Sequence, residues 1–382
     1  ICFCSRSYAM LLLGRIVEGV GAAATSANSQ GIIVQTFPAH ERGKALGMSG
    51  SSVALGTMVG PSIGGLIVHH FSWNMVFGMS IPFTIICFML CVKYLPDMSS
   101  GRREKVDTGG VLLFIVTILC VYSGVKLLQN GAAYYLYCGA LLLISIAFGV
   151  IFTRWERRHD NAMIHLDIFK NKLYTVSVFC AFISFLAISG HNFIQPFYLQ
   201  KVQMLSAAQT GLLMMAYSLT MFVVAPFSGQ LSDKIGSEIL CFIGLCTVSA
   251  AQLILSTLGV GSPLWIFLIG SILMSFGMAM FQSPNTSLIM STVSPNLTGI
   301  AGSINGLARN LGTVFGISLS TVLLYNIMST QLGIAVTDFV AGQEIAFVTG
   351  MQWVYRFMAA VSLLGAILTG LRWKNSRREK NN

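Results

Sequence analysis

The sequence predicts an all-α fold, a polytopic membrane helical bundle with about eleven transmembrane helices. Hydrophobic residues make up 54% of the 382 residues and charged residues only 9%, whereas soluble domains carry roughly 25% charged residues. Apolar runs of roughly 18 residues or more, long enough to cross a bilayer, recur along nearly the whole chain. Lipid is therefore the expected solvent of most of this chain.

The predicted helices follow the apolar runs in order. They cover residues 9–34, 45–68, 74–95, 108–129, 132–153, 174–198, 208–230, 239–259, 264–290, 300–326 and 352–373. An odd number of spans places the two termini on opposite sides of the membrane. Of the 23 Lys and Arg, 17 fall in alternate connections and in the tail, so the positive-inside rule predicts a cytoplasmic C-terminus. We expect a multi-pass protein of the cell (inner) membrane.

The net charge of +10 is explained by these basic connections, so the expected partner is the lipid bilayer and no nucleic acid. The nine cysteines include seven inside apolar runs, and the sequence has no CxxC or Cys/His cluster, so no metal site is predicted. It also has no GxxxxGK[ST] loop for ATP. We expect neither an enzyme nor a bound cofactor.

The first span holds a charged pair, Arg15 and Glu18, one helical turn apart. A charge in the hydrocarbon core costs at least about 2.5 kcal/mol, so we expect both side chains to point into the bundle or a wet cavity. Glu18 is a candidate proton carrier, because water access from either side of the membrane can change its protonation with conformation. The alternative is a permanent ion pair that only fixes helix packing.

The second span has glycines at four-residue spacing, Gly56, Gly60 and Gly64, followed by Gly65. The spacing predicts a face without side chains that permits close helix approach. Pro61 removes a backbone donor and is expected to bend the helix. Close packing without a further role is the alternative.

Polar residues in the later spans are candidates for a substrate cavity. His191 and Gln195 share a face of the sixth span, and His191 is a second, weaker candidate for proton coupling. A satisfied hydrogen-bond network between helices would explain this pair equally well. The candidate cavity residues are Asn28, Asn192, Gln195, Gln282, Asn285, Asn305 and Arg309.

The connection from Gly229 to Gly236 has glycine at both ends, which permits a tight turn. Asp233 within it can accept hydrogen bonds from the N-terminus of a neighbouring helix. Such a contact would act as a latch that favours one access state, with Lys234 beside it. An ordinary capped turn is the alternative.

An internal repeat joins the two ends of the chain, because Leu55–Gly60 reappears as Leu311–Gly316. The match extends upstream through the pairs Gly43 and Gly299, Asn28 and Asn285, and Pro38 and Pro295. Two consecutive helices with their connection therefore occur twice in the same orientation. This predicts a duplicated transporter with its substrate site between the halves.

These residues together resemble a known family. Residues 15–23 are similar to the fourth-helix motif of the major facilitator superfamily, and residues 56–65 to the fifth-helix motif of its drug:proton antiporters. The connection 229–236 resembles the cytoplasmic loop motif in its second-half copy. The resemblance implies two pseudo-symmetric halves and export. The family commonly has Gln where this chain has Glu18, so the proton role of Glu18 rests on its own chemistry.

The resemblance also implies a domain organisation. The chain opens at Ile1 without Met, and similarity to the fourteen-span branch implies an N-terminally truncated member. The predicted regions are 1–95, the remainder of the N-terminal half; 96–172, a central region with two extra helices and basic cytoplasmic loops; 173–373, the C-terminal half; and 374–382, a basic cytoplasmic tail.

The expected function is secondary active transport. The resemblance implies export of small amphipathic or cationic compounds, such as drugs, in exchange for protons by alternating access. The expected partners are a small-molecule substrate, protons and lipid, and the protein is expected to be a monomer. Two alternatives remain: proton-coupled transport of one specific metabolite, because fold does not fix substrate, and a membrane receptor without transport.

Overall fold

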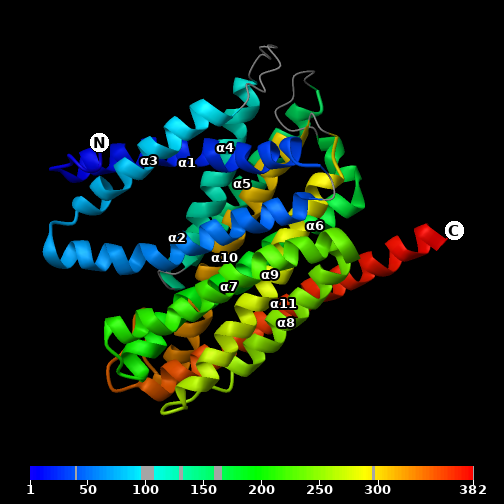
Figure 1. Ribbon diagram of the computed structural model, residues 1–382. Helices are drawn as coiled ribbons and strands as arrows, with labels where there is room; N and C mark the ends of the chain where they lie inside the picture. Colours follow the sequence, from blue (N-terminus) through cyan, green and yellow to red (C-terminus); the bar gives the residue numbers. More distant parts are fainter. Residues whose placement is uncertain (39–40, 96–106, 129–131, 159–165, 295–296, 382) are drawn as a thin grey trace.

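The computed structural model describes residues 1–38, 41–95, 107–128, 132–158, 166–294 and 297–381. The described residues form eleven long helices and no strand (Figure 1). Their bounds are α1 Tyr8–Thr36, α2 Arg42–His70, α3 Met75–Tyr94, α4 Thr108–Leu127, α5 Tyr135–Glu156, α6 Lys172–Phe197, α7 Ala207–Ile235, α8 Ser237–Leu255, α9 Leu264–Ser291, α10 Thr298–Leu332 and α11 Glu344–Asn381. The short turns η3 Ala132–Tyr134, η4 Leu166–Lys170 and η5 Tyr198–Val202 complete the described elements.

The predicted helix order is confirmed, with one clear difference at the C-terminal end. Helix α11 begins at Glu344, about two turns before the predicted residue 352, and continues to Asn381 through the predicted tail. Among the described residues, ten helices are long and apolar enough to cross a membrane: α1 and α3 to α11. Several side chains of α2, including Pro61, lie outside the described set, as does Pro295 of the repeat.

The second half of the chain forms the main core, in which α6 and α8 to α11 pack against one another. Small residues permit this packing. A Cβ added at Gly244 of α8 would lie 2.7 Å from the carbonyl oxygen of Gly277 in α9. At the end of α11, Arg372 is buried and donates to Ser177 Oγ of α6 at 2.8 Å. This arginine therefore packs inside the second half and does not begin a solvated tail.

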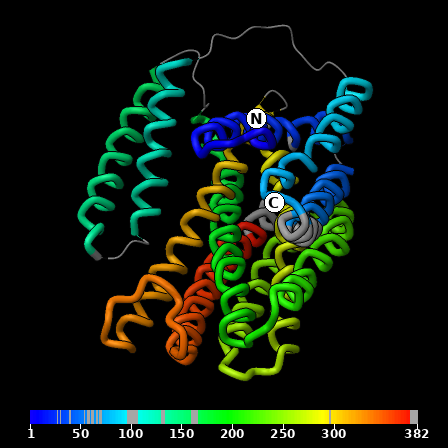
Figure 2. The backbone as a smooth tube through the Cα atoms, turned by 90° about the vertical axis from the view of Figure 1, so that its left-hand side faces the viewer, coloured from blue at the N-terminus to red at the C-terminus, as the bar shows by residue number. Residues whose placement is uncertain are grey.

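The extra central pair of helices forms a hairpin of α4 and α5 beside α10 (Figure 2). Asp107 caps the hairpin, because its carboxylate accepts from the backbone N–H of Gly110 at 2.9 Å and from Trp155 Nε1 at 3.0 Å. Near the other end of the hairpin, Gly124 packs against Leu142. The hairpin is thus a compact unit on the outside of the bundle.

The first half, α1 to α3, joins the second half mainly through α2, which packs along α7. Helix α1 contacts α10, and its preceding segment contacts α3, where Asn74 Nδ2 donates to the carbonyl oxygen of Phe3 at 3.2 Å. Figure 1 shows α2 and α7 meeting near the Gly236 turn and diverging toward their other ends. The two halves are therefore joined at one end, here called the Gly236 end.

Candidate functional site

The junction at the Gly236 end is built on one carboxylate. Asp233, in the last turn of α7, accepts from the backbone N–H of Gly43 at 3.0 Å and from that of Lys44 at 3.1 Å. Both donors lie in the first turn of α2, where backbone N–H groups have no partner within the helix and the helix dipole favours a negative charge. Asp233 thus lies at a helix N-terminus, as the sequence predicts, and it bridges the two halves.

Glycines allow the helices to approach closely at this junction. A Cβ added at Gly43 would lie 2.5 Å from Asp233 Oδ1 and 2.5 Å from the carbonyl oxygen of Gly229. One turn later, a Cβ at Gly47 would lie 2.5 Å from the carbonyl oxygen of Ala225. Real Cβ atoms do not come this close, so only glycine fits at these positions. Of the two glycines that end the predicted loop motif, only Gly229 packs closely, because a Cβ there would clash with the backbone of Gly43. Gly236 has open space beside it and instead adopts a positive φ of 96°.

The prediction of close approach at Gly56, Gly60 and Gly64 is wrong for the described residues. A Cβ at any of the three would meet no atom within 4 Å. The physical reason is rotational, because these glycines lie on a different face of α2 from the Gly43 and Gly47 face that meets α7. The surroundings of Pro61 and Gly65 lie outside the described set.

A cavity of about 230 Å³ lies between the halves, next to the junction. Its walls come from α1 and α2 on one side and from α6, α7, α9 and α10 on the other. The lining residues are Ser26, Ser29, Leu46, Ser49, Gly50, Val53, Phe185, Met221, Ala225, Gln282, Ser283, Thr286, Gly306, Arg309 and Asn310. The hydroxyl of Ser283 donates to the carbonyl oxygen of Gly43 at 3.1 Å and so ties the cavity to the junction.

Two of the seven predicted cavity residues, Gln282 and Arg309, line this cavity. The Arg309 guanidinium lies over the ring of Phe185, with 4.5 Å between Cζ and the ring centroid. The other five lie elsewhere. Asn28 is exposed and donates to its own helix, Asn285 is buried and donates to Ser177 O, Asn305 and Gln195 are buried, and Asn192 is exposed.

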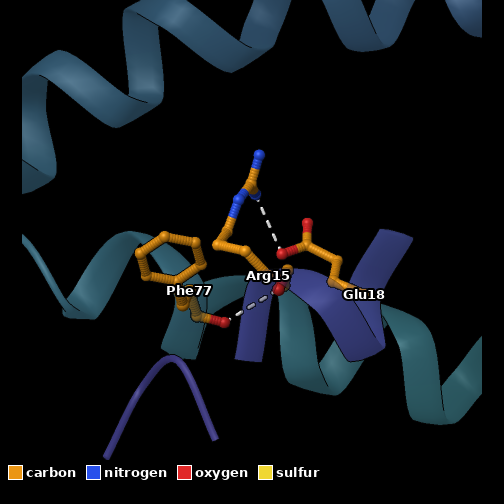
Figure 3. A network of polar contacts seen from close by, with 4 residues as sticks. Arg15, Glu18 and Phe77 are labelled. Carbon is orange, nitrogen blue, oxygen red and sulfur yellow. Dashed lines mark hydrogen bonds and ion pairs between the residues drawn. The ribbon is translucent and has the colours of Figure 1, made fainter. Parts of the chain in front are cut away.

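The expected placement of the charged pair in α1 is also corrected. Arg15 Nη1 donates to Glu18 Oε2 at 2.9 Å, as the dashed line in Figure 3 marks, but the two side chains are 58% and 53% exposed. Helix α1 packs against the second half through its later turns, where Gly31 meets Gly299. The pair lies two turns or more before that contact and outside the cavity lining. Its role in proton coupling stays a prediction.

His191 is buried inside the second half rather than in the cavity. Its Nδ1 shares a hydrogen bond of 2.9 Å with the hydroxyl of Tyr355 in α11, and the ring of Phe267 stacks nearby at 6.2 Å. His191 Nε2 and Gln195 Oε1 have no hydrogen-bond partner among the described residues. The hydrogen bond to Tyr355 occupies one ring nitrogen of His191, and the role of His191 in proton coupling stays a prediction.

We expect Tyr355→Phe to lower the free energy of unfolding by about 1–3 kcal/mol, because it leaves a buried imidazole nitrogen without its partner. Thermal unfolding of the purified protein in detergent measures the effect. Tyr137→Phe is the control. Tyr137 is 63% exposed, so removal of its hydroxyl should leave the midpoint of thermal unfolding unchanged. Equal midpoints for Tyr355→Phe and the unmodified protein would show that the hydrogen bond does not stabilise the fold.

Comparisons with known proteins agree with this architecture. A family profile described as Major Facilitator Superfamily matches residues 1–317 and 177–382. The chain belongs to the major facilitator superfamily. It is 30% identical over 370 residues to the riboflavin transporter RibZ of Clostridioides difficile, covering 97% of this chain and 78% of that protein. It is also 30% identical over 373 residues to the lincomycin resistance protein LmrB of Listeria monocytogenes, with 94% and 77% covered.

A solved superfamily structure has the same fold. The crystal structure of the human organic anion transporter MFSD10 (TETRAN) aligns with a TM-score of 0.66 and 16% identity, covering 96% of this chain and 72% of that chain. The low identity makes this a likeness of fold alone. The chain is therefore a major facilitator superfamily transporter with a multi-pass helical architecture.

Sequence reasoning missed several residues of the transporter's cavity. Ser26 and Ser29 share a face of α1, and Ser49 faces them from α2. The i and i+3 spacing of the first two was visible in the sequence, but serine is common in membrane helices and carries little signal alone. Nothing in the sequence distinguishes Phe185 from the other members of the 25 phenylalanines. Only tertiary structure brings these side chains together around Arg309.

The repeated glycines of the transporter differ in their surroundings. In α10, a Cβ at Gly312 or Gly316 would clash with the backbone of α6 at Phe182 and Leu186. The corresponding Gly56 and Gly60 of α2 have open space beside them. In the described structure, close packing at these repeated glycines therefore occurs in the second copy, whereas the prediction placed it in the first.

Proposed function

We propose that this transporter exports small amphipathic compounds, drugs among them, in exchange for protons by alternating access. One observation carries the proposal: the cavity lies between the two halves and is bounded at one end by the Asp233 junction. Relative movement of the halves would separate them at this junction. The cavity would then be accessible from the side of the membrane that the junction now closes, as in transporters built from parallel repeats. The proposed working unit is a monomer, because residues of a single chain line the cavity.

The distribution of basic residues supports an orientation with the Gly236 end in the cytoplasm. The C-terminal end of α11 lies on the same side of the molecule as the turn between α7 and α8 (Figure 1). With this orientation, the Asp233 junction closes the cytoplasmic side of the cavity. Release of an exported compound requires this access state.

Glu18 is the proposed proton carrier in the first half. We expect Glu18→Gln to abolish the acceleration of export by an inward proton gradient while downhill flux of substrate continues, because an amide cannot release a proton. Substrate flux from sealed vesicles, with and without a pH gradient, measures both quantities. Asp167→Asn serves as control, because Asp167 is 81% exposed and lies outside the long helices. Full proton dependence in Glu18→Gln would refute the assignment.

A general test uses the protein encoded by the intact gene, reconstituted in liposomes. The proposal expects substrate movement that an imposed pH gradient accelerates and that dissipation of the gradient slows. A rate of substrate flux that does not depend on the pH gradient would refute the coupling to protons.

Transport of one specific metabolite is the second candidate, supported by the name of RibZ beside that of LmrB. Competition by chemically unrelated compounds separates the two, because a dedicated transporter would resist such competitors. Binding without flux would instead support a membrane receptor.

A further inference from the structure

We infer that the cavity takes anionic amphipathic ligands, whose acidic group, a carboxylate or sulfonate, pairs with Arg309. This inference rests on the proposed function and names its substrate class. Such ligands are amphipathic, but they carry the opposite charge to the cationic compounds that the family resemblance also implies. The observation behind the inference is the sign of the charge in the cavity walls.

Arg309 lies deep in the membrane-spanning part of the molecule. It follows the first residue of α10, Thr298, by eleven positions in a helix of 35 residues, which is roughly 16 Å along the axis. A charged side chain at such a depth is costly and normally has a partner or a water-filled cavity. Arg309 faces the cavity, which supplies the water in the absence of ligand.

Among the described residues, no carboxylate lines the cavity beside Arg309, and Asp233 at the adjacent junction accepts from the backbone N–H groups of Gly43 and Lys44. The fifteen described lining residues include Arg309 and no Asp or Glu. The sequence also contains no acidic residue from 168 to 232, from 239 to 337 or from 345 to 378. Helices α6 to α11 therefore carry their acidic residues only near their ends. Glu18 of α1 is already paired with Arg15, two turns or more from Ser26 in the lining.

The aromatic contact orients the guanidinium for ligand binding. Phe185 covers one face of the Arg309 plane at 4.5 Å, and stacking on a face leaves the N–H donors at the edges of the plane free. These donors can bind a planar carboxylate with two parallel hydrogen bonds. Gln282 and the hydroxyls of Ser26, Ser29 and Ser49 provide further polar groups in the same cavity.

Apolar side chains in the same cavity suit the apolar part of such a ligand. Leu46, Val53 and Met221 line the cavity from α2 and α7. A molecule with an acidic group at one end and an apolar body would contact Arg309 and these side chains together. A compact permanent cation would instead meet an unpaired positive charge, which repels it.

Direct binding of two dyes tests the inference. We would measure fluorescence anisotropy of carboxyfluorescein, an anion, and of ethidium, a permanent cation, with the purified protein in detergent. The unmodified protein should bind carboxyfluorescein more tightly. Arg309→Gln should weaken that binding by about tenfold or more, because it removes a charge-assisted hydrogen bond. Arg309→Lys should retain part of the affinity, and Arg309→Gln should bind ethidium more tightly than the unmodified protein.

A control variant and the second dye distinguish the loss of the Arg309 charge from misfolding as the cause of weaker carboxyfluorescein binding. Arg356→Gln removes the same charge from α11, where the exposed Arg356 lies over Trp353 outside the cavity, and should leave both affinities unchanged. A gain in ethidium binding requires a folded cavity. Tighter binding of ethidium than of carboxyfluorescein by the unmodified protein, or unchanged carboxyfluorescein binding in Arg309→Gln, would overturn the inference.

A flux measurement separates this inference from the proposed function. Arg309-dependent binding of carboxyfluorescein without any flux in liposomes would support the ligand class and refute transport. Proton-driven flux of ethidium that carboxyfluorescein does not inhibit would support transport and refute the ligand class.

Discussion

Replacement of Asp233 by Ala is expected to reduce transport by at least about tenfold. Its carboxylate accepts two backbone hydrogen bonds at the N-terminus of α2, and hydrogen bonds to charged groups contribute about 1.5–3 kcal/mol each. Loss of both should weaken the closed junction by about 3 kcal/mol, which lowers its population relative to the open state roughly 100-fold. A transporter that seldom closes this end cannot complete its cycle. Initial rates of substrate flux in liposomes measure the effect.

The control for this variant removes a carboxylate far from the junction. Asp338→Asn alters the loop before α11, where Asp338 accepts only from the adjacent Phe339 N–H in the described structure, and transport should continue at the normal rate. Asp233→Glu should retain part of the activity, because the charge remains although the length changes. Normal flux in Asp233→Ala would mean that the contact is an ordinary capped turn.

The second large effect is expected for Gly43→Ala. The new Cβ would lie 2.5 Å from two oxygen atoms, Asp233 Oδ1 and Gly229 O, and backbone cannot move aside as a flexible side chain can. Overpacking of this kind costs about 1–3 kcal/mol, so the variant should unfold at lower temperature and separate α2 from α7. Thermal unfolding in detergent and crosslinking between the two helices measure the two effects.

Gly211→Ala provides a matched control on α7. A Cβ at Gly211 would meet no atom within 4 Å, so the substitution adds the same methyl group where space exists. Its stability and crosslinking should equal those of the unmodified protein. An equally stable Gly43→Ala protein with intact crosslinking would contradict the close approach at the junction.

The sequence predicts the helices well because the bilayer imposes their length. A span needs roughly 20 apolar residues, and each predicted run coincides with a helix to within a few residues, apart from the longer α11. The position of Asp233 near a helix end was also predictable from Gly236, which ends α7. The predicted connection from Gly229 is wrong, because Gly229 lies inside α7, which continues to Ile235. The helix lengths and the position of Asp233 were predictable because each depends on residues that are close together in the sequence.

The cavity was less predictable because helix rotation decides which side chains reach it. Gln282 and Arg309 line the cavity, whereas Asn285 and Asn305, a turn or less away on the same helices, are buried within the second half. A polar residue in an apolar run indicates that a partner exists and does not indicate which one. The same ambiguity explains the wrong prediction for Gly56. The four-residue spacing predicts a face of glycines on α2, but it does not determine whether another helix packs against that face.

Movement of the two halves is the central claim, and the distance between spin labels at Lys44 and Lys234 tests it most directly. Both side chains are exposed beside the junction, so double electron–electron resonance in liposomes can follow the Gly236 end. We predict a short distance for the closed junction and a longer one for the open state, with Asp233→Ala increasing the longer population. A single distance, unchanged by pH gradient, ligand or that substitution, would contradict alternating access at this junction.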